Sequence, residues 1–257
     1  MNIVMIGSGN VATHLSTAMY KAGHRIEQVW SRNASHARDL ANEVEANAID
    51  DLRTVCSSAD YYIIAVPDDA ISSIAGSLPH INGIVIHTSG SVSIEVLKQT
   101  NTDHGVLWFP HSFVKNAKMD YSSLNCCVES SSPKTGDKIS ELVKSFAGHI
   151  YHINSQQRRW AHLSSVMANN FTHALNAMTE EMMNAHNLDF QIIRPLILET
   201  AMTAQQDHLS NYQTGPAIRG DIKTIESHRA LLANTPEVLN VYNALTALIQ
   251  ERSKSSK

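Results

Sequence analysis

The first half of the chain alternates short apolar runs with stretches in which apolar residues recur every three or four positions. The apolar runs cover residues 2–7, 26–32, 61–67, 83–90, 105–110, 125–130 and 149–153, and the helical patterns cover 10–23, 34–45, 70–78 and 138–146. Such alternation is typical of a mostly parallel sheet covered by helices. We therefore predict an α/β domain with a Rossmann-like, doubly wound sheet over residues 1–153.

The pattern changes after residue 153, where strand signals nearly vanish. Helical spacing then covers residues 158–186, 192–207 and 237–250, and a loop with Gly215, Pro216 and Gly220 leads into a further helix. We predict an all-α domain over residues 154–257. Its apolar, Met-rich helices favour burial against a second copy of the chain, which predicts a homodimer formed through these helices.

The composition narrows the classes of partner. The chain has 257 residues and a net charge of −4, which gives no electrostatic reason to expect a nucleic acid or an anionic membrane as partner. The short apolar start has no basic segment before it, and no run of 18 apolar residues occurs, so neither a signal peptide nor a membrane span is expected. Three cysteines without a CxxC spacing predict no metal site. A cytoplasmic location fits these features.

A glycine-rich turn follows the first apolar run. A GxGxxA pattern between a buried strand and a helix is the fingerprint of a dinucleotide site. The first glycine permits the tight turn, the second lets a pyrophosphate approach, and the alanine lets the helix pack closely on the strand. The predicted cofactor-binding residues of this turn are Gly7, Ser8, Gly9, Asn10, Val11 and Ala12.

The end of the second strand indicates which dinucleotide is bound. NAD sites carry an Asp or Glu about 20 residues after the glycines to bind the ribose hydroxyls. Here the sequence has Ser31, Arg32 and Asn33 instead. These residues suit a ribose 2′-phosphate, and Arg32 adds a planar face for adenine. NADP(H) is therefore favoured over NAD(H), although Arg32 in an exposed position is the alternative.

Two further strand ends reach the same edge of the predicted sheet, where ligands bind in open α/β folds. Both segments are candidates for the nicotinamide side of the cofactor site, and each is equally compatible with a plain strand-to-loop exit. The residues concerned are Val66, Pro67 and Asp68 after one strand, and Thr88, Ser89 and Gly90 after the next.

The chain resembles the superfamily of pyrroline-5-carboxylate reductase and deazaflavin-dependent NADP oxidoreductases in the segments GSGNVA, SRN, AVPDDAI and IHTSG. Three later segments are similar to a branch that joins a Rossmann-like domain to a C-terminal helical domain of unknown function: FPHSF, HLSSVMANNF and TGPAIRGD. The resemblance covers nearly the whole chain and implies an NADP-dependent oxidoreductase. It transfers the fold better than the substrate.

The resemblance also implies candidate residues for catalysis and for the substrate cleft. These are His111, Ser112, Asn169, Asn170, Thr214, Gly215, Arg219 and Asp221. The pattern of the branch places a proline directly after the histidine, whereas Pro110 precedes it here. Related hydroxyacid dehydrogenases carry a Lys-x-x-x-Asn pair, whereas the helix predicted over residues 158–186 has no lysine.

The same residues have structural alternatives. Asn169 and Asn170 are poor helix formers in the middle of a predicted helix, so they form either part of a site or an exposed pair. Arg219 and Asp221 belong either to the substrate cleft or to a structural salt bridge or helix cap.

A histidine titrating near neutral pH suits proton donation in carbonyl or imine reduction. His111 is our first candidate and His87 the second, and either is alternatively a structural histidine. We predict hydride transfer between nicotinamide and an imine or carbonyl carbon of a small metabolite. The alternatives are a non-catalytic NADP-binding regulatory protein and a flavin- or deazaflavin-linked NADP reductase.

Overall fold

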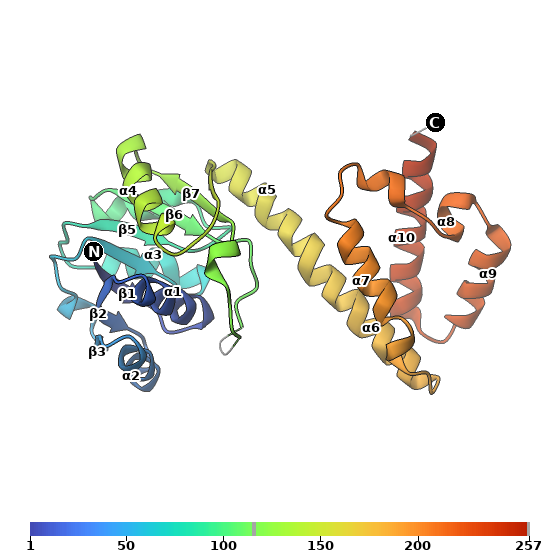
Figure 1. The fold of residues 1–257 in the computed structure, drawn as a ribbon, viewed down its shortest axis with the longest axis horizontal. Helices are drawn as coiled ribbons and strands as arrows, with labels where there is room; N and C mark the ends of the chain where they lie inside the picture. Colours follow the sequence, from blue (N-terminus) through green and yellow to red (C-terminus); the bar gives the residue numbers. More distant parts are fainter. Residues whose placement is uncertain (115–116, 256–257) are drawn as a thin grey trace. The chain divides into compact units, whose positions relative to one another are not determined.

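The computed structural model describes residues 1–114 and 117–255. Contacts within the chain divide it into two compact units, Met1–Asn169 and Asn170–Lys257 (Figure 1). The sequence places the change from strands to helices at residue 154, and the compact division falls later, inside a helical segment. The assignment of separate functions to residues 1–153 and 154–257 stays a prediction.

One sheet forms the centre of the first unit. Within the described residues it has eight strands in the order β3-β2-β1-β4-β5-β6-β7-β8, and only the β6–β7 pair is antiparallel. This confirms the predicted mostly parallel, doubly wound sheet. The strands are β1 (Asn2–Ile6), β2 (Arg25–Trp30), β3 (Asn47–Ile49), β4 (Tyr61–Ile64), β5 (Ile84–His87), β6 (His104–Trp108), β7 (Cys126–Ser130) and β8 (Ile150–His152).

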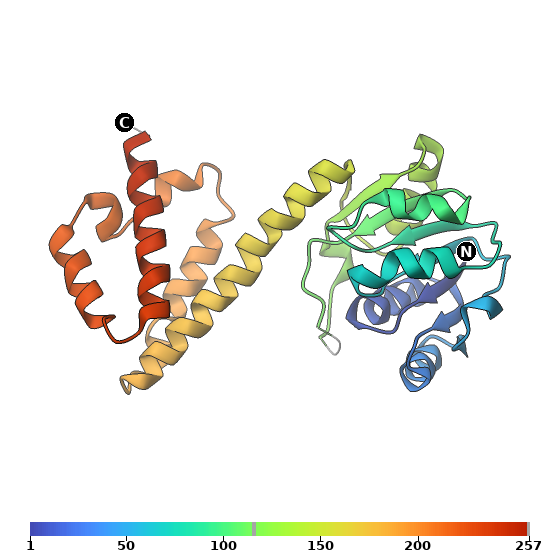
Figure 2. The same cartoon turned by 180° about the vertical axis from the view of Figure 1, so that it is seen from behind.

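Helices cover both faces of the sheet, which explains why β1 is apolar at successive positions. Ile3 and Met5 pack towards α1 (Asn10–Lys21), α2 (Ala34–Glu43) and α4 (Pro133–Lys144) (Figure 1). Val4 and Ile6 pack towards α3 (Asp68–Ser77) and the 3₁₀ segment Ile94–Thr100 (Figure 2). All four side chains are fully buried. β1 and β4 are parallel neighbours, and the order in which the chain adds strands to the sheet reverses between them: β2 and β3 lie beyond β1, and β5 and β6 lie beyond β4. Ligands of such folds bind beyond the carboxyl ends of the strands at this point.

Two elements differ from the sequence prediction. β3 was not expected, because it is a three-residue edge strand without an apolar run. α4 begins at Pro133 rather than at residue 138, because Ser132 caps it by accepting a hydrogen bond from the backbone amide of Thr135 at 3.2 Å. Proline at the first helical position fits this start, since its missing N–H would have no partner there.

The helix predicted over residues 158–186 is helical to Ala185, but it is not one regular α-helix. α5 (Ser155–Ser165) starts at a capping box in which Asn154 and Gln157 bond each other's backbone amides at 2.9 Å. A π-helical segment, Val166–Phe171, then leads into α6 (Thr172–Ala185). The division between the two compact units falls inside this π-helical segment.

The second unit is helical, as predicted. It contains α6, α7 (Arg194–Thr203), α8 (Pro216–Arg219), α9 (Ile222–Leu231) and α10 (Pro236–Ser255). Its described part buries few large side chains, and none of the residues of α7 is buried. Leu196, Leu198 and Met202 of this helix are each at least 60% exposed. In the described part of the chain, no helix combines the length and the apolar character needed to cross a membrane.

Candidate functional site

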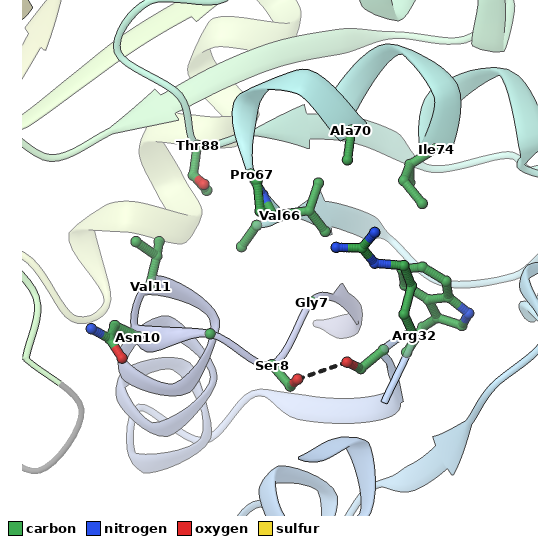
Figure 3. A pocket seen from close by; sticks show the side chains of 14 residues that line it. Gly7, Ser8, Asn10, Val11, Arg32, Val66, Pro67, Ala70, Ile74 and Thr88 are labelled. Atoms are coloured by element: carbon green, nitrogen blue, oxygen red, sulfur yellow. Dashed lines mark hydrogen bonds between the residues drawn. The ribbon is translucent and has the colours of Figure 1, made fainter. Parts of the chain in front are cut away.

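A pocket of about 410 Å³ lies in the first unit, beyond the carboxyl ends of β1, β2, β4 and β5 (Figure 3). It brings together residues that the sequence predicted from four separate segments. The pocket is lined by Gly7, Ser8, Gly9, Asn10, Val11, Trp30, Ser31, Arg32, Ala65, Val66, Pro67, Ala70, Ile74 and Thr88.

Glycine stands at positions 7 and 9 of the turn for different structural reasons. Gly7 has a φ of +130°, and a Cβ there would lie 2.1 Å from the carbonyl oxygen of Ala65 on β4's exit. Gly9 has an ordinary φ of −77°, and a Cβ there would meet nothing within 4 Å. The fold therefore requires glycine at position 7, whereas the space left open at Gly9 suits a ligand that approaches the backbone.

The turn fits a pyrophosphate. Gly9 caps the start of α1, and the first turn contains no acidic residue. Within the part of the chain that the structure describes, no side chain caps the amides of that turn. Unpaired amides at a helix N-terminus and the helix dipole together favour an anion. Fully buried Ala12 packs beneath the turn, as the small residue of the motif should.

Hydroxyl groups and a guanidinium line the end of the pocket at β2. Ser8 Oγ donates to Ser31 Oγ at 2.8 Å, and the Arg32 side chain extends into the pocket on the side of Ile74 (Figure 3). Among the described residues, no Asp or Glu lines the pocket. Asn33 instead caps α2, because its Oδ1 accepts from the amides of Ser35 and His36 at 3.0 and 3.3 Å. This set of groups fits a ribose 2′-phosphate better than ribose hydroxyls.

The loop after β5 supplies the opposite end of the pocket, where Thr88 lies near Val11 (Figure 3). The two residues that follow Thr88, Ser89 and Gly90, make structural contacts within the protein. Ser89 Oγ accepts from the amides of Ser91 and Val92 at 3.1 and 3.0 Å. A Cβ at Gly90 would lie 2.6 Å from the His162 ring on α5.

His87 is fully buried at the end of β5 and does not line the pocket. Its Nδ1 accepts a hydrogen bond from the Ser89 amide at 3.2 Å. Burial, and then the charge of Arg158, lower the pKa of His87 to about 4. The imidazole is therefore neutral at neutral pH and shielded from solvent, which suits a structural residue better than a proton donor.

His111 and Ser112 lie exposed in the loop after β6. The His111 ring contacts Phe113 edge-on, with the centroids 5.4 Å apart. Asn10, from the pocket wall, donates through Nδ2 to the Phe113 carbonyl at 2.9 Å. The loop that carries His111 is therefore fixed to the glycine turn, although His111 itself does not line the pocket.

Five of the predicted cofactor residues do not line the pocket: Ala12, Asn33, Asp68, Ser89 and Gly90. Asp68 lies in the first turn of α3 and accepts a hydrogen bond from Ser91 Oγ. Sequence reasoning missed four lining residues: Trp30, Ala65, Ala70 and Ile74. Trp30 and Ala65 directly adjoin predicted segments, so the sequence carried a usable signal for them. Ala70 and Ile74 are spaced by four and share one face of α3, but the spacing alone does not show that this face lines the pocket.

The remaining candidates lie in the helical part of the chain. Asn169 and Asn170 are exposed in the π-helical segment, and Thr214 and Gly215 precede α8. Asp221 caps α9: it accepts from the amide of Thr224 at 3.1 Å and from its hydroxyl at 2.7 Å. These bonds and the charge of Arg219 lower the pKa of Asp221. The cap is the structural alternative considered for Asp221, and a role in the cleft stays a prediction for this residue and Arg219.

Comparisons with known proteins agree with this geometry. Residues 2–89 match the family described as NADP oxidoreductase, coenzyme F420-dependent, and residues 124–249 match a domain of unknown function, DUF2520. A solved "putative NADP oxidoreductase" from Bacteroides fragilis is 33% identical, with a TM-score of 0.87 over 97% of this chain and 98% of that chain. The matches confirm the predicted resemblance, and they confirm NADP(H) as the cofactor at the level of the family.

Two more distant proteins extend the comparison. An imine reductase from Myxococcus stipitatus, solved in complex with NADP⁺, shares the fold at 15% identity, with a TM-score of 0.68 over 99% of this chain and 95% of that chain. A glycerol-3-phosphate dehydrogenase [NAD(P)+] from Legionella pneumophila (strain Corby) is 32% identical over 30% of this chain. That match spans only 27% of the dehydrogenase's length.

The two glycines predict different outcomes for the same substitution. Gly9→Ala should leave the melting temperature unchanged, because its Cβ meets nothing, yet weaken NADPH binding by about tenfold or more, equivalent to about 1.4 kcal/mol. Gly7→Ala should lower stability by more than about 1 kcal/mol, because alanine at positive φ is strained and its Cβ collides with Ala65. Thermal unfolding and calorimetric titration measure both. Unchanged NADPH affinity in Gly9→Ala would place the cofactor elsewhere.

The buried histidine predicts sensitivity to acid. The folded-state pKa of His87 lies below the usual value of 6.5, so the unfolded chain takes up the proton first. Stability is therefore retained above about pH 6.5 and lost as the pH falls towards 4, by up to about 1.4 kcal/mol per pH unit. Replacing His87 by Asn keeps an acceptor for the Ser89 amide and removes the titration. The fall in melting temperature between about pH 7 and pH 5 should be smaller in this variant. His36→Asn, at an exposed histidine, is the control, and an identical fall in all three proteins would contradict the assignment.

Proposed function

The chain belongs to the family that joins an NADP oxidoreductase domain to a DUF2520 domain, and we propose that it is an NADPH-dependent reductase of an imine or carbonyl group in a small metabolite. The observation that carries the proposal is the single pocket wall shared by the glycine turn, Arg32 and Thr88. The first amides of α1 offer an anion site in the middle of the pocket. Arg32 offers a site for a second phosphate at one end, and Thr88 places an uncharged hydroxyl at the other.

In this proposal the residues of the chain bind and orient the cofactor. The amides that follow Gly9 hold the pyrophosphate, and Arg32 with Ser31 holds the 2′-phosphate. Trp30, Ala70 and Ile74 provide apolar surface beside Arg32 that suits adenine. Thr88 lies at the end where the nicotinamide belongs. The bound cofactor supplies the hydride, so the protein's contribution is orientation and exclusion of water.

His111 is the better supported proton donor of the two candidate histidines. It is solvent-accessible and lies in a loop that Asn10 ties to the cofactor turn, whereas His87 is buried and neutral. A proton donor must reach both solvent and the reacting atom, and only His111 meets the first requirement. The roles that the resemblance suggests for Asn169, Asn170, Ser112, Thr214 and Gly215 are part of the same proposal.

We also infer that two copies of the chain associate through the helical unit. The apolar side chains of α7 point to all sides of the helix, and none of its residues is buried within one copy. Large apolar side chains that lie exposed together ordinarily mark a surface that binds a partner. A second copy would supply the missing cover, and Leu196, Leu198 and Met202 would form part of that interface.

A second candidate function is supported by the description of the matched family. That description names coenzyme F420, a deazaflavin, as the partner of NADP. In this alternative the reduced or oxidised deazaflavin takes the place of the small metabolite beside Thr88. The non-catalytic alternative rests on the sequence, because the helix predicted over residues 158–186 has no lysine that could donate a proton.

Arg32 predicts the preference between cofactors. The wild-type protein should bind NADPH more tightly than NADH, and Arg32→Ala should lower NADPH affinity by about ten- to a hundredfold, because a charge-assisted hydrogen bond contributes about 1.5–3 kcal/mol. NADH affinity should change little. Arg53→Ala is the matched control, since Arg53 is exposed, pairs with Asp51 and lies outside the pocket. Equal affinities for both nucleotides in the wild type would contradict the role of Arg32.

The reaction class is tested by following NADPH absorbance with a panel of cyclic imines, 2-oxoacids, flavins and deazaflavins. We expect NADPH oxidation with an imine or a carbonyl compound when no flavin is present, because a small neutral hydroxyl group, that of Thr88, lines the end of the pocket proposed for the nicotinamide. Oxidation only with a deazaflavin would favour the second candidate. Tight NADPH binding without oxidation by any acceptor would contradict both.

A further inference from the structure

A fully buried arginine connects α5 to the loop that follows β5. Arg158 has no exposed side-chain surface. Its Nε and Nη2 donate to Glu129 Oε2 on β7 at 3.1 and 2.9 Å, and Ser155 Oγ donates to Glu129 Oε1 at 2.6 Å. The remaining nitrogen, Nη1, donates to the carbonyl oxygen of Ser89 at 2.9 Å. One guanidinium thus joins a helix, a strand and a loop.

The loop that receives this bond is the one that carries Thr88. The amide of Thr88 donates to the Ile64 carbonyl at 3.2 Å, and the next residue along, Ser89, is held by Arg158. The ring of His162, one turn further along α5, closes on Gly90 and packs against Trp108 with centroids 5.8 Å apart. The loop from Thr88 to Gly90 is therefore held by the sheet from one side and by α5 from the other.

Docking of the helix alone does not require this arrangement. Ala161 of α5 already packs on the apolar cluster that includes Val106 and Trp108. Burying a guanidinium costs several kcal/mol unless it is paired and fully hydrogen-bonded, and apolar residues of similar size often replace such pairs without loss of stability. Arginine differs from them in its fork of donors, which can bond a carboxylate and a carbonyl at once.

We propose that Arg158 is a positioning residue for the nicotinamide half of the cofactor. Its Nη1 fixes the Ser89 carbonyl, and this fixes Thr88 at the pocket end opposite Arg32. The inference rests on the proposed function, because it requires that NADPH binds in this pocket. It assigns a role in cofactor binding to the first helix after the sheet, outside the residues that line the pocket.

The test compares two nucleotides that share one half of the site. Adenosine 2′,5′-bisphosphate carries the adenine and the 2′-phosphate but no nicotinamide, so it reports on the Arg32 end alone. Arg158→Lys keeps a positive charge for Glu129, but a point charge cannot bond Glu129 and Ser89 in the fork geometry. This variant should bind NADPH at least about fivefold more weakly while its affinity for adenosine 2′,5′-bisphosphate is unchanged. The fluorescence of bound NADPH, which arises from the reduced nicotinamide, should change as well.

A matched control separates positioning from stability. Asn154→Ala removes the capping box at the start of α5, which should lower stability and leave the Arg158–Ser89 bond in place. Its melting temperature should fall while its ratio of affinities for the two nucleotides stays that of the wild type. If Arg158→Lys does not fold, the double variant Arg158→Met with Glu129→Gln removes both charges together, keeps the acceptor for Ser155, and should show the same selective loss.

The results distinguish a failure of the role proposed for Arg158 from a failure of the proposed function. If Arg158→Lys loses affinity for both nucleotides equally, or for neither, Arg158 has no positioning role, although NADPH still binds in the pocket. If the wild-type protein binds neither nucleotide, the proposed function itself fails, and the inference falls with it.

Discussion

The close approach of two strand ends decides where the site lies. Gly7, after β1, has no side chain because the Ala65 carbonyl, after β4, occupies the position that a Cβ would take. With the strands this close, the chain turns sharply at Gly7 and enters α1 with its first amides free. The loops after β2 and β5 border the same hollow, so Arg32 and Thr88 reach its two ends. Affinity for an anion therefore follows from the backbone geometry of the turn, whereas the preference for one dinucleotide follows from the side chains at the two ends of the pocket.

The second constraint comes from a residue that is bonded to β7, near the β8 edge of the sheet. Arg158, on the first helix after β8, gives one donor to Ser89, whose neighbour Thr88 lines the pocket. Burial, and then the charge of Arg158, lower the pKa of His87, so this histidine at the end of β5 remains neutral. The apolar side chains of the sheet are mostly buried. In the helical unit, by contrast, many large apolar side chains lie exposed within one copy of the chain. Association with a second copy, as proposed above, would cover this apolar surface.

The fold was largely predictable, and the site only in its outline. Gly7 and Gly9 could be identified because a dinucleotide turn has a fixed spacing and a fixed place after a buried strand. The lining by Ala70 and Ile74 depends on how α3 packs beside the turn, which no local pattern encodes. Arg158 and Arg159 are adjacent and chemically identical, yet only Arg158 is buried, so its bond to Ser89 could not be inferred from the sequence. The interruption of the long helix at Val166–Phe171 was equally hidden, since its residues continue a helical pattern.

We propose that the pocket beyond β1, β2, β4 and β5 holds NADPH with its 2′-phosphate at the β2 end. A crystal structure of the protein with NADP⁺ tests this directly. We expect the pyrophosphate over the amides that follow Gly9, the 2′-phosphate within hydrogen-bond distance of Arg32 and Ser31, and the nicotinamide beside Thr88. A dinucleotide bound in the reverse direction, or with its 2′-phosphate directed away from Arg32, would contradict it.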